Sequence, residues 1–432
     1  MLFLSAALNV KHATSQSRSA RTNRFFPLAK KSLNELLAKR EWLDVYSNAA
    51  AWREHVCKSC DGEAVVVTTA DGRALSGIFA RRANDELLQR RDMERLRSNG
   101  VGTTMLPRDS AVLLFHANAC VALDMVEYCI WYRAMGMHVL MVSMSAYGDS
   151  EGEASESSTY MDADAAFRWI QSRLGGLRPE RVVAHGLSIG AALAFALADR
   201  YPGMHVCSDQ GFTTAKEVAG VVARKALGEY LPDTVVNAFC DATFPAGIAT
   251  PDGRFITDGY DNVTKAKRLH GSLFVMSADG DAMMPSSFAD ALLDARYSKP
   301  PPVERNSARC NDGKKKPDAV GSSILHSIFI SLGSPEPSTS GVQTHSTSGT
   351  TSLTTGAEVA LKAIAEEEQE KTKCAIVLSG QHGTFFGEQP EQAAVYHAHL
   401  VKLGLVADRQ TIISALKETH MKGLSGGHSI IS

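Results

Sequence analysis

The sequence lacks any run of about 18 apolar residues, the length that a membrane-spanning helix requires. It also lacks an excess of charge of either sign, because 45 Lys and Arg stand against 47 Asp and Glu. Without a net field or a motif that reads DNA or RNA, nucleic acid is not expected as a partner. Hydrophobic residues make up 44% of the 432 residues, which excludes wholesale disorder.

Cysteine is sparse as well. The eight cysteines are spread along the chain without the dense spacing of a secreted disulfide-rich domain, so an intracellular, reducing compartment is expected, with the cytoplasm as the first assignment. Cys57 and Cys60 form a C-x-x-C pair, but no second pair or histidine cluster accompanies them to complete a tetrahedral zinc site. We interpret them as ordinary thiols and expect neither a metal nor an organic cofactor.

Acidic residues are absent from residues 1–34, a leader that carries six Lys and Arg and five serines. This composition fits organelle targeting or peripheral contact with an anionic membrane surface, and it equally fits a solvated, flexible tail. Leucine and aromatic residues then recur at helical spacing, which predicts a helical extension over residues 35–61.

Residues 62–404 carry the pattern of an α/β domain. A hairpin is expected first, with its turn at Ala70-Asp71-Gly72. The later strands are apolar throughout and alternate with helices, which predicts a mostly parallel central sheet with helices on both faces. The expected strands are Glu63–Thr69, Arg73–Arg81, Ala111–His116, His138–Ser143, Arg181–Gly186, His205–Ser208, Leu273–Ser277 and Cys374–Leu378. The expected helices are Cys120–Met135, Thr159–Arg173, Ile189–Tyr201 and Gln389–Leu403.

Two segments interrupt this pattern. Residues 212–268 form a mostly helical insertion, which is expected to act as a cap over a site. Residues 299–356 begin with a proline run and end in a stretch where more than half of the residues are Ser or Thr. This low-complexity composition predicts a disordered, exposed insert. Residues 405–432 form a C-terminal tail.

Three stretches match the pattern G-x-S-x-G, centred on Ser150, Ser188 and Ser425. A nucleophile elbow also needs an apolar strand before the serine, an apolar helix after it and small residues two positions away. Ser188 alone has this context, since Arg181–His185 enters it and Ile189–Ala196 leaves it. Ser188 is therefore the expected nucleophile; the alternative is a small residue in a tight strand-to-helix turn.

A serine hydroxyl becomes a useful nucleophile when a base takes its proton and an acid orients that base. In a parallel sheet both should lie on loops after later strands, in the order serine, acid, histidine. His382, in a glycine-containing loop after the last expected strand, is the expected base. Asp281 is the expected acid, while Asp279 in the same loop and Asp209 after the preceding strand remain alternatives.

Backbone N–H groups should bind the oxyanion that develops during acyl transfer. Ile189 supplies one by its position after the nucleophile, and Asn118 is expected to supply the second from the loop His116–Ala119. The alternative for this loop is a plain strand-to-helix turn. The other histidines of these regions are expected to be structural: His185, His397, His399, His420 and His428.

At these residues the chain resembles the α/β-hydrolase serine hydrolases. Within that superfamily it is most similar to the intracellular α/β-hydrolase-domain proteins, a group that includes protein depalmitoylases, and to related bacterial hydrolases. The resemblance covers roughly residues 62–298 and 373–404. It is carried by Leu113–Ala119, by Ala146–Glu156, by the elbow at Ser188 and by the two later loops.

The resemblance implies the α/β-hydrolase fold and the triad Ser188, Asp281 and His382. It also implies that Asn118 and Ile189 supply the oxyanion N–H groups, and that the Gly148–Gly152 loop is structural. The chain departs from the family pattern in its long insert and in having His116-Ala117 where the family usually has His-Gly.

The sequence therefore predicts a serine hydrolase that cleaves carboxylic esters or thioesters through an acyl-enzyme. Its substrate would be a small-molecule ester, a lipid or an acylated protein. One alternative is a catalytically silent interaction protein that keeps the hydrolase scaffold and acts through its basic leader and Ser/Thr-rich insert. Another is a serine peptidase, for which no propeller-sized domain is evident to select peptides.

Overall fold

The computed structural model of the chain describes residues 31–35, 47–83, 109–118, 120–227, 232, 234–235, 248–249, 255–256, 259–298 and 374–406. The chain divides into two units, residues 1–298 with 367–432, and residues 299–366. All described residues belong to the first unit. Most of the predicted leader, the predicted insert and nearly all of the predicted tail lie outside the described residues and stay predictions.

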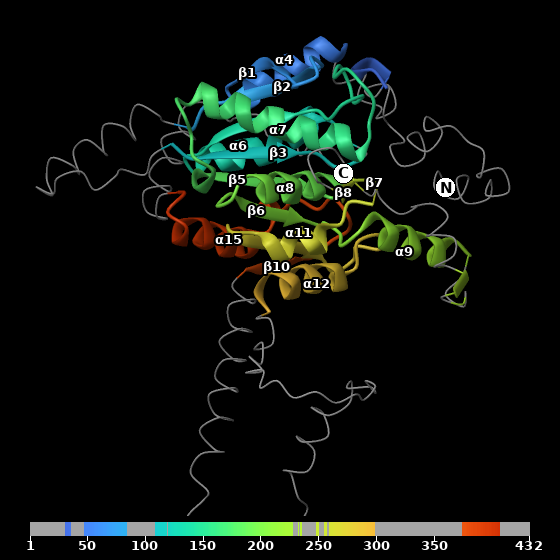
Figure 1. The fold of residues 1–432 in the computed structure, drawn as a ribbon. Coiled ribbons are helices and arrows are strands. Elements are labelled where there is room, and N and C mark those ends of the chain that lie inside the picture. Colours follow the sequence, from blue (N-terminus) through green and yellow to red (C-terminus); the bar gives the residue numbers. More distant parts are fainter. Residues whose placement is uncertain are drawn as a thin grey trace, which may run out of the picture. The chain divides into compact units, whose positions relative to one another are not determined.

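An eight-stranded sheet forms the centre of the described residues (Figure 1), in the order β1-β2-β4-β3-β5-β6-β9-β10. Strand β2 runs antiparallel to both of its neighbours, and every pair from β4 to β10 is parallel. The predicted hairpin and the mostly parallel sheet are confirmed. The strands are β1 (Gly62–Thr68), β2 (Ala74–Ala80), β3 (Ala111–Phe115), β4 (His138–Val142), β5 (Val182–Leu187), β6 (His205–Asp209), β9 (Leu273–Ala278) and β10 (Ala375–Leu378), and a separate pair is β7 (Ile248–Ala249) and β8 (Phe255–Ile256).

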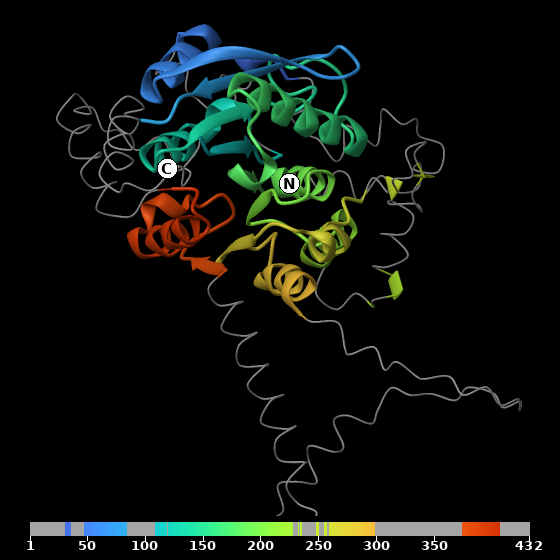
Figure 2. The same cartoon turned by 60° about the vertical axis from the view of Figure 1, so that its left-hand side comes forward.

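Helices cover both faces of the sheet (Figure 2). Helices α6 and α15 share one face, where Trp131 stacks on Tyr396 with ring centroids 5.7 Å apart. Helices α7, α8, α11 and α12 pack in that order on the other face. The described helices are α4 (Ala49–Ser59), η3 (Ala122–Met125), α6 (Val126–Ala134), α7 (Glu156–Arg173), η4 (Pro179–Arg181), α8 (Ile189–Arg200), α9 (Ala215–Leu227), α11 (Asn262–Arg268), α12 (Ser286–Tyr297), η5 (Phe386–Glu388) and α15 (Pro390–Lys402).

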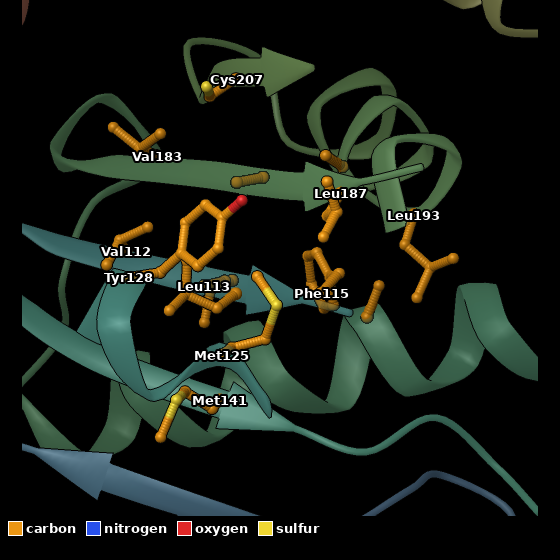
Figure 3. Close-up of a cluster of buried hydrophobic side chains, with 14 of the residues drawn as sticks. Val112, Leu113, Phe115, Met125, Tyr128, Met141, Val183, Leu187, Leu193 and Cys207 are labelled. Atoms are coloured by element: carbon orange, nitrogen blue, oxygen red, sulfur yellow. The ribbon is translucent and has the colours of Figure 1, made fainter. Parts of the chain in front are cut away.

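The central strands are apolar runs because they are covered on both faces. Every residue of β3, β4, β5 and β9 is buried. Figure 3 shows part of this core, in which Phe115 of β3, Leu187 of β5 and Leu193 of α8 belong to one apolar cluster. Each such side chain contributes about 1.5–3 kcal/mol when fully buried. The core therefore fixes the end of β5 and the turn that follows it.

Local capping explains where α7 begins. The prediction placed its start at Thr159, but the helix starts at Glu156 because the hydroxyl of Ser155 accepts a hydrogen bond from the amide of Ser158 at 3.1 Å. The predicted helix Cys120–Met135 is divided into η3 and α6. In the part of the chain that the structure describes, no helix is long and apolar enough to cross a bilayer.

The predicted extension and cap are described in part. Helix α4 lies within the predicted extension over residues 35–61, of which residues 36–46 lie outside the description. In the predicted cap-like interval 212–268, α11 packs against α8 and α12 as part of the helical layer over the sheet. Most of residues 228–258 are not described, so the cap role stays a prediction.

Candidate active site

Ser188 occupies the turn between β5 and α8, with a φ of 56° and a ψ of −116°. A positive φ is unfavourable for a residue that carries a Cβ. Such strain costs of order 1–3 kcal/mol and persists only where the surrounding structure enforces it. The turn therefore has the strained strand-to-helix backbone of a nucleophile elbow.

Two glycines allow the strand and the helix to approach each other at this turn. A Cβ on Gly186 would lie 2.0 Å from the carbonyl oxygen of Gly190, and a Cβ on Gly190 would lie 2.1 Å from the carbonyl oxygen of Phe115. Neither position has room for a larger residue. The small residues on either side of Ser188 are thus required sterically, and the start of α8 rests on the end of β3.

Ser150, the second serine in a G-x-S-x-G stretch, has a structural role. Its hydroxyl donates to the carbonyl of Ser143 at 2.8 Å and accepts from the amide of Ser76 at 2.9 Å. These bonds join the loop after β4 to β2. The third such serine, Ser425, lies outside the described residues.

Asp281 follows β9, and its side chain is fully buried. Its Oδ1 accepts from the amides of Met283 and Met284 at 2.8 and 2.9 Å, and its Oδ2 lies 2.7 Å from Nδ1 of His382. Burial raises the pKa of the Asp281 carboxyl, but the hydrogen bonds from His382 and the two amides outweigh it and hold the pKa below its ordinary value. Asp281 is therefore an oriented carboxylate.

His382 lies in the loop between β10 and η5, and 23% of its side chain is exposed. A carboxylate can only accept a hydrogen bond, so Nδ1 carries the proton of the neutral ring. Nε2 is then the basic nitrogen. The pair Asp281 and His382 thus has the orientation that a general base requires.

Asp279, the first alternative acid, shapes the loop instead. Its Oδ1 accepts from the amide of Gly380 at 2.9 Å. The amide of Gly280 donates to the carbonyl of the same Gly380 at 2.8 Å. These bonds join the loop after β9 to the loop after β10, and so they hold the acid and the histidine near each other.

Asp209, the second alternative acid, belongs to a buried network. Its Oδ2 accepts from the hydroxyl of Tyr128 at 3.0 Å and lies 3.3 Å from Nε2 of His185. Nδ1 of His185 lies 2.6 Å from the hydroxyl of Tyr132. His185 is therefore structural, as predicted, and Asp209 is the partner of His185 and not of His382.

Of the remaining described histidines, His399 has the predicted structural role, and the role of His397 stays a prediction. His399 of α15 is buried, and its Nε2 lies 3.0 Å from the hydroxyl of Ser272. His397 lies on the same helix. His420 and His428 are outside the described residues and stay predictions.

Backbone hydrogen bonds bring the elbow to the same end of the sheet as the two loops. The amide of Ser188 donates to the carbonyl of Asp209 at 2.8 Å, and the amide of Gln210 donates to the carbonyl of Met276 at 2.7 Å. Within the described residues, no hydrogen bond joins the hydroxyl of Ser188 to His382. The structure thus pairs the acid with the base at the end of the sheet where the elbow lies.

The two expected oxyanion donors follow the ends of the neighbouring strands β5 and β3. Ile189 is the first residue of α8, where amide N–H groups have no carbonyl partner within the helix. Asn118 follows β3, whose end touches Gly190, and its Oδ1 accepts from the hydroxyl of Tyr147. The φ of Ala117 is not positive, so its backbone does not require glycine. Its Cβ is therefore tolerated where the family usually has glycine.

Sequence reasoning missed two glutamines that hold the His382 loop. The side-chain amide of Gln389 accepts from the amide of Ser379 at 2.9 Å and donates to the carbonyl of the same residue at 3.0 Å. The side-chain Nε2 of Gln210 donates to the carbonyl of Thr384 at 2.9 Å. A glutamine that binds backbone groups belongs to no recognisable sequence motif. In the sequence, only the position of Gln210 directly after a strand end indicates that it could lie near the site.

Cys57 and Cys60 are free thiols. Cys60 is buried, and its thiol lies 3.9 Å from the carbonyl oxygen of Cys57. Across the described ranges, no group of three or more His, Cys, Asp or Glu side chains is arranged to hold a metal ion.

Curated proteins include relatives at low identity. An uncharacterized protein of Mycobacterium tuberculosis is 25% identical over 264 residues, which cover 60% of this chain and 78% of the relative. Alpha/beta hydrolase domain-containing protein 17B of Homo sapiens is 26% identical over 211 residues, which cover 48% of this chain and 62% of that relative. The match thus spans less than two thirds of the human protein. No family model matches the chain.

Some solved structures are similar to parts of the chain at low TM-score. An alpha-beta hydrolase from Vibrio vulnificus has a TM-score of 0.44 and 17% identity, over 66% of this chain and 85% of that chain. An esterase from Pyrococcus furiosus has a TM-score of 0.38 and 16% identity, over 54% of this chain and 76% of that chain. Both likenesses concern the fold alone.

Proposed function

We propose that the chain, which has the α/β-hydrolase fold and low-identity relatives named alpha/beta hydrolase domain-containing proteins, is a serine hydrolase that cleaves carboxylic esters or thioesters. One observation carries the proposal: buried Asp281 orients His382 at the end of the sheet where Ser188 occupies a strained elbow. A carboxylate, an imidazole and such a serine are the parts that acyl transfer requires.

In the acylation step, the Ser188 oxygen attacks the acyl carbonyl carbon, and Nε2 of His382 accepts the hydroxyl proton. Asp281 stabilises the imidazolium that forms, through its bond to Nδ1. The N–H groups of Ile189 and Asn118 bind the oxyanion of the tetrahedral intermediate. The intermediate collapses when the bond to the leaving alcohol or thiol breaks and the imidazolium returns the proton to it.

Water completes the reaction in the deacylation step. His382 accepts a proton from water as the water oxygen attacks the acyl-enzyme, and it returns that proton to Ser188 as the acid product leaves. The partial exposure of the His382 side chain gives water access to the ring. The proposed substrates are acyl esters or thioesters of small molecules, lipids or proteins.

Hydrolysis of model substrates tests this proposal. We expect p-nitrophenyl esters or acyl-cysteine thioesters of increasing chain length to be hydrolysed by the full chain, and Ser188→Ala to lower kcat by about 10⁴-fold or more, because the nucleophile is lost. The matched control is Ser150→Ala, in the other described G-x-S-x-G stretch, which should keep most of the activity. Equal rates for Ser188→Ala and the parent would contradict the proposal.

A further inference from the structure

Gln210 lies between the nucleophile elbow and the histidine loop. It directly follows β6, is 1% exposed and has a φ of 46°. The residue before it, Asp209, accepts the amide hydrogen bond of Ser188, and the amide of Gln210 itself is bound to Met276 of β9. The chain at residues 209 and 210 is thus bound both to the elbow at Ser188 and to β9, the strand that precedes Asp281.

Every proton of the Gln210 side-chain amide has an acceptor. Nε2 donates to Oδ1 of Asp209 at 3.1 Å and to the carbonyl of Thr384 at 2.9 Å. Oε1 accepts from the amide of Gly383. The reversed amide would place its oxygen against a carboxylate and a carbonyl, so these neighbours select a single orientation.

We propose that Gln210 is a positioning residue that sets the distance between His382 and Ser188 by clamping the backbone immediately after His382. This inference rests on the proposed function. Asp281 orients the imidazole from Nδ1, and Asp279 and Gln389 bind the loop only before His382, at Gly380 and Ser379. Gln210 supplies the restraint after His382, because Gly383 and Thr384 follow His382 directly and are bound to the residue directly after β6, beside Ser188.

The size of the expected effect follows from geometry. Displacement of a catalytic group by about 1 Å can cost about 10²-fold in rate. Gln210 touches neither the acyl group nor the oxyanion donors in this account, so its loss should act on kcat and spare KM. A role in stability alone would lower the amount of folded protein and leave the kcat of the folded fraction unchanged.

Two substitutions test the clamp in the full chain. Gln210→Met keeps the volume and removes all three side-chain hydrogen bonds, whereas Gln210→Asn keeps an amide but is one methylene shorter and cannot span to the loop. We expect both to lower kcat for a p-nitrophenyl ester by about 10- to 100-fold with KM nearly constant. The matched control is Gln171→Met, at a glutamine whose Nε2 donates to the carbonyl of Leu177 at 3.0 Å after α7; it should keep the parent kcat.

Hydrogen exchange reports on the clamp independently of turnover. The amide of Gly383 should exchange slowly in the parent and faster in both Gln210 variants, with thermal unfolding used to verify that each sample is folded. Parent-like kcat, or parent-like exchange at Gly383, in either folded variant would overturn the inference. If the parent hydrolyses no ester and resists fluorophosphonate, the proposed function is refuted, and the positioning role of Gln210 is refuted with it. In that case, faster exchange of the Gly383 amide in the Gln210 variants would show that Gln210 has a structural role only.

Discussion

Asp281 is the carboxylate that contacts His382. Its carboxylate receives two backbone amides and the Nδ1 proton of His382, and it has no solvent-exposed surface in its side chain. These donors hold the pKa below the ordinary value in spite of burial. The same bonds that orient the base therefore also stabilise the folded state when the group is ionised.

Replacing Asp281 by Asn should affect both activity and the pH dependence of stability. Asn can present an N–H to Nδ1 and so favour the wrong tautomer of His382, and we expect kcat to fall by about 10⁴-fold. The folded-state pKa of Asp281 lies below its unfolded value of about 3.9, so its contribution to stability is fully present above that pH and is lost as the pH falls through the lower folded-state pKa.

Urea unfolding of the parent and Asp281→Asn at a series of pH values from about 7 down to about 3 measures this contribution. The difference in the free energy of unfolding should be constant near neutrality and shrink at the acidic end. Asp279→Asn is the matched control, because Asp279 binds the amide of Gly380 and not the histidine. An Asp281→Asn variant with parent kcat would remove Asp281 from the mechanism.

At the scale of elements, the elbow depends on contact between α8 and the ends of two strands. A Cβ on Gly190 would lie 2.1 Å from the carbonyl oxygen of Phe115, and a Cβ on Gly186 would meet backbone atoms of Gly190. No side-chain rotation relieves such contacts, because the obstructing atoms are backbone. The first turn of α8, which supplies the N–H of Ile189, is therefore set by the absence of two side chains.

Gly190→Ala should push α8 away from β3. We expect a loss of stability of several kcal/mol, in the upper range of single substitutions, and loss of ester hydrolysis in any protein that remains folded. Ala196→Gly, in the same helix, is the control, and should cost only about 1 kcal/mol through helix propensity while activity is kept. Denaturant unfolding measures the stability of both variants. A Gly190→Ala variant as stable as the parent would refute the steric argument.

The sequence predicted the element types well because the central strands are buried on both faces and read as uninterrupted apolar runs. Helix starts were less predictable, since the start of α7 depends on the hydroxyl of Ser155 accepting the amide of Ser158 and not on the apolar pattern. The split of residues 120–135 into η3 and α6 is likewise a local backbone effect that periodicity does not report.

Across the whole molecule, the order of strands along the chain predicts some residues of the candidate site and not others. Asp281 and His382 could be selected because each follows a strand end, and parallel strands deliver their carboxyl ends to one place. Gln210 could not be selected, because its partner Thr384 is 174 positions away and both bonded groups on the loop are backbone. The strand order that makes them neighbours exists only in the folded sheet.

In the proposed mechanism, the folded sheet turns Ser188 into an activated nucleophile. A fluorophosphonate probe incubated with the full chain, followed by peptide mapping, tests it most directly. We expect one labelled residue, Ser188, with labelling lost in Ser188→Ala, strongly slowed in His382→Ala and retained in Ser150→Ala. Folded protein that resists the probe, or a label that maps to another residue and survives Ser188→Ala, would contradict it.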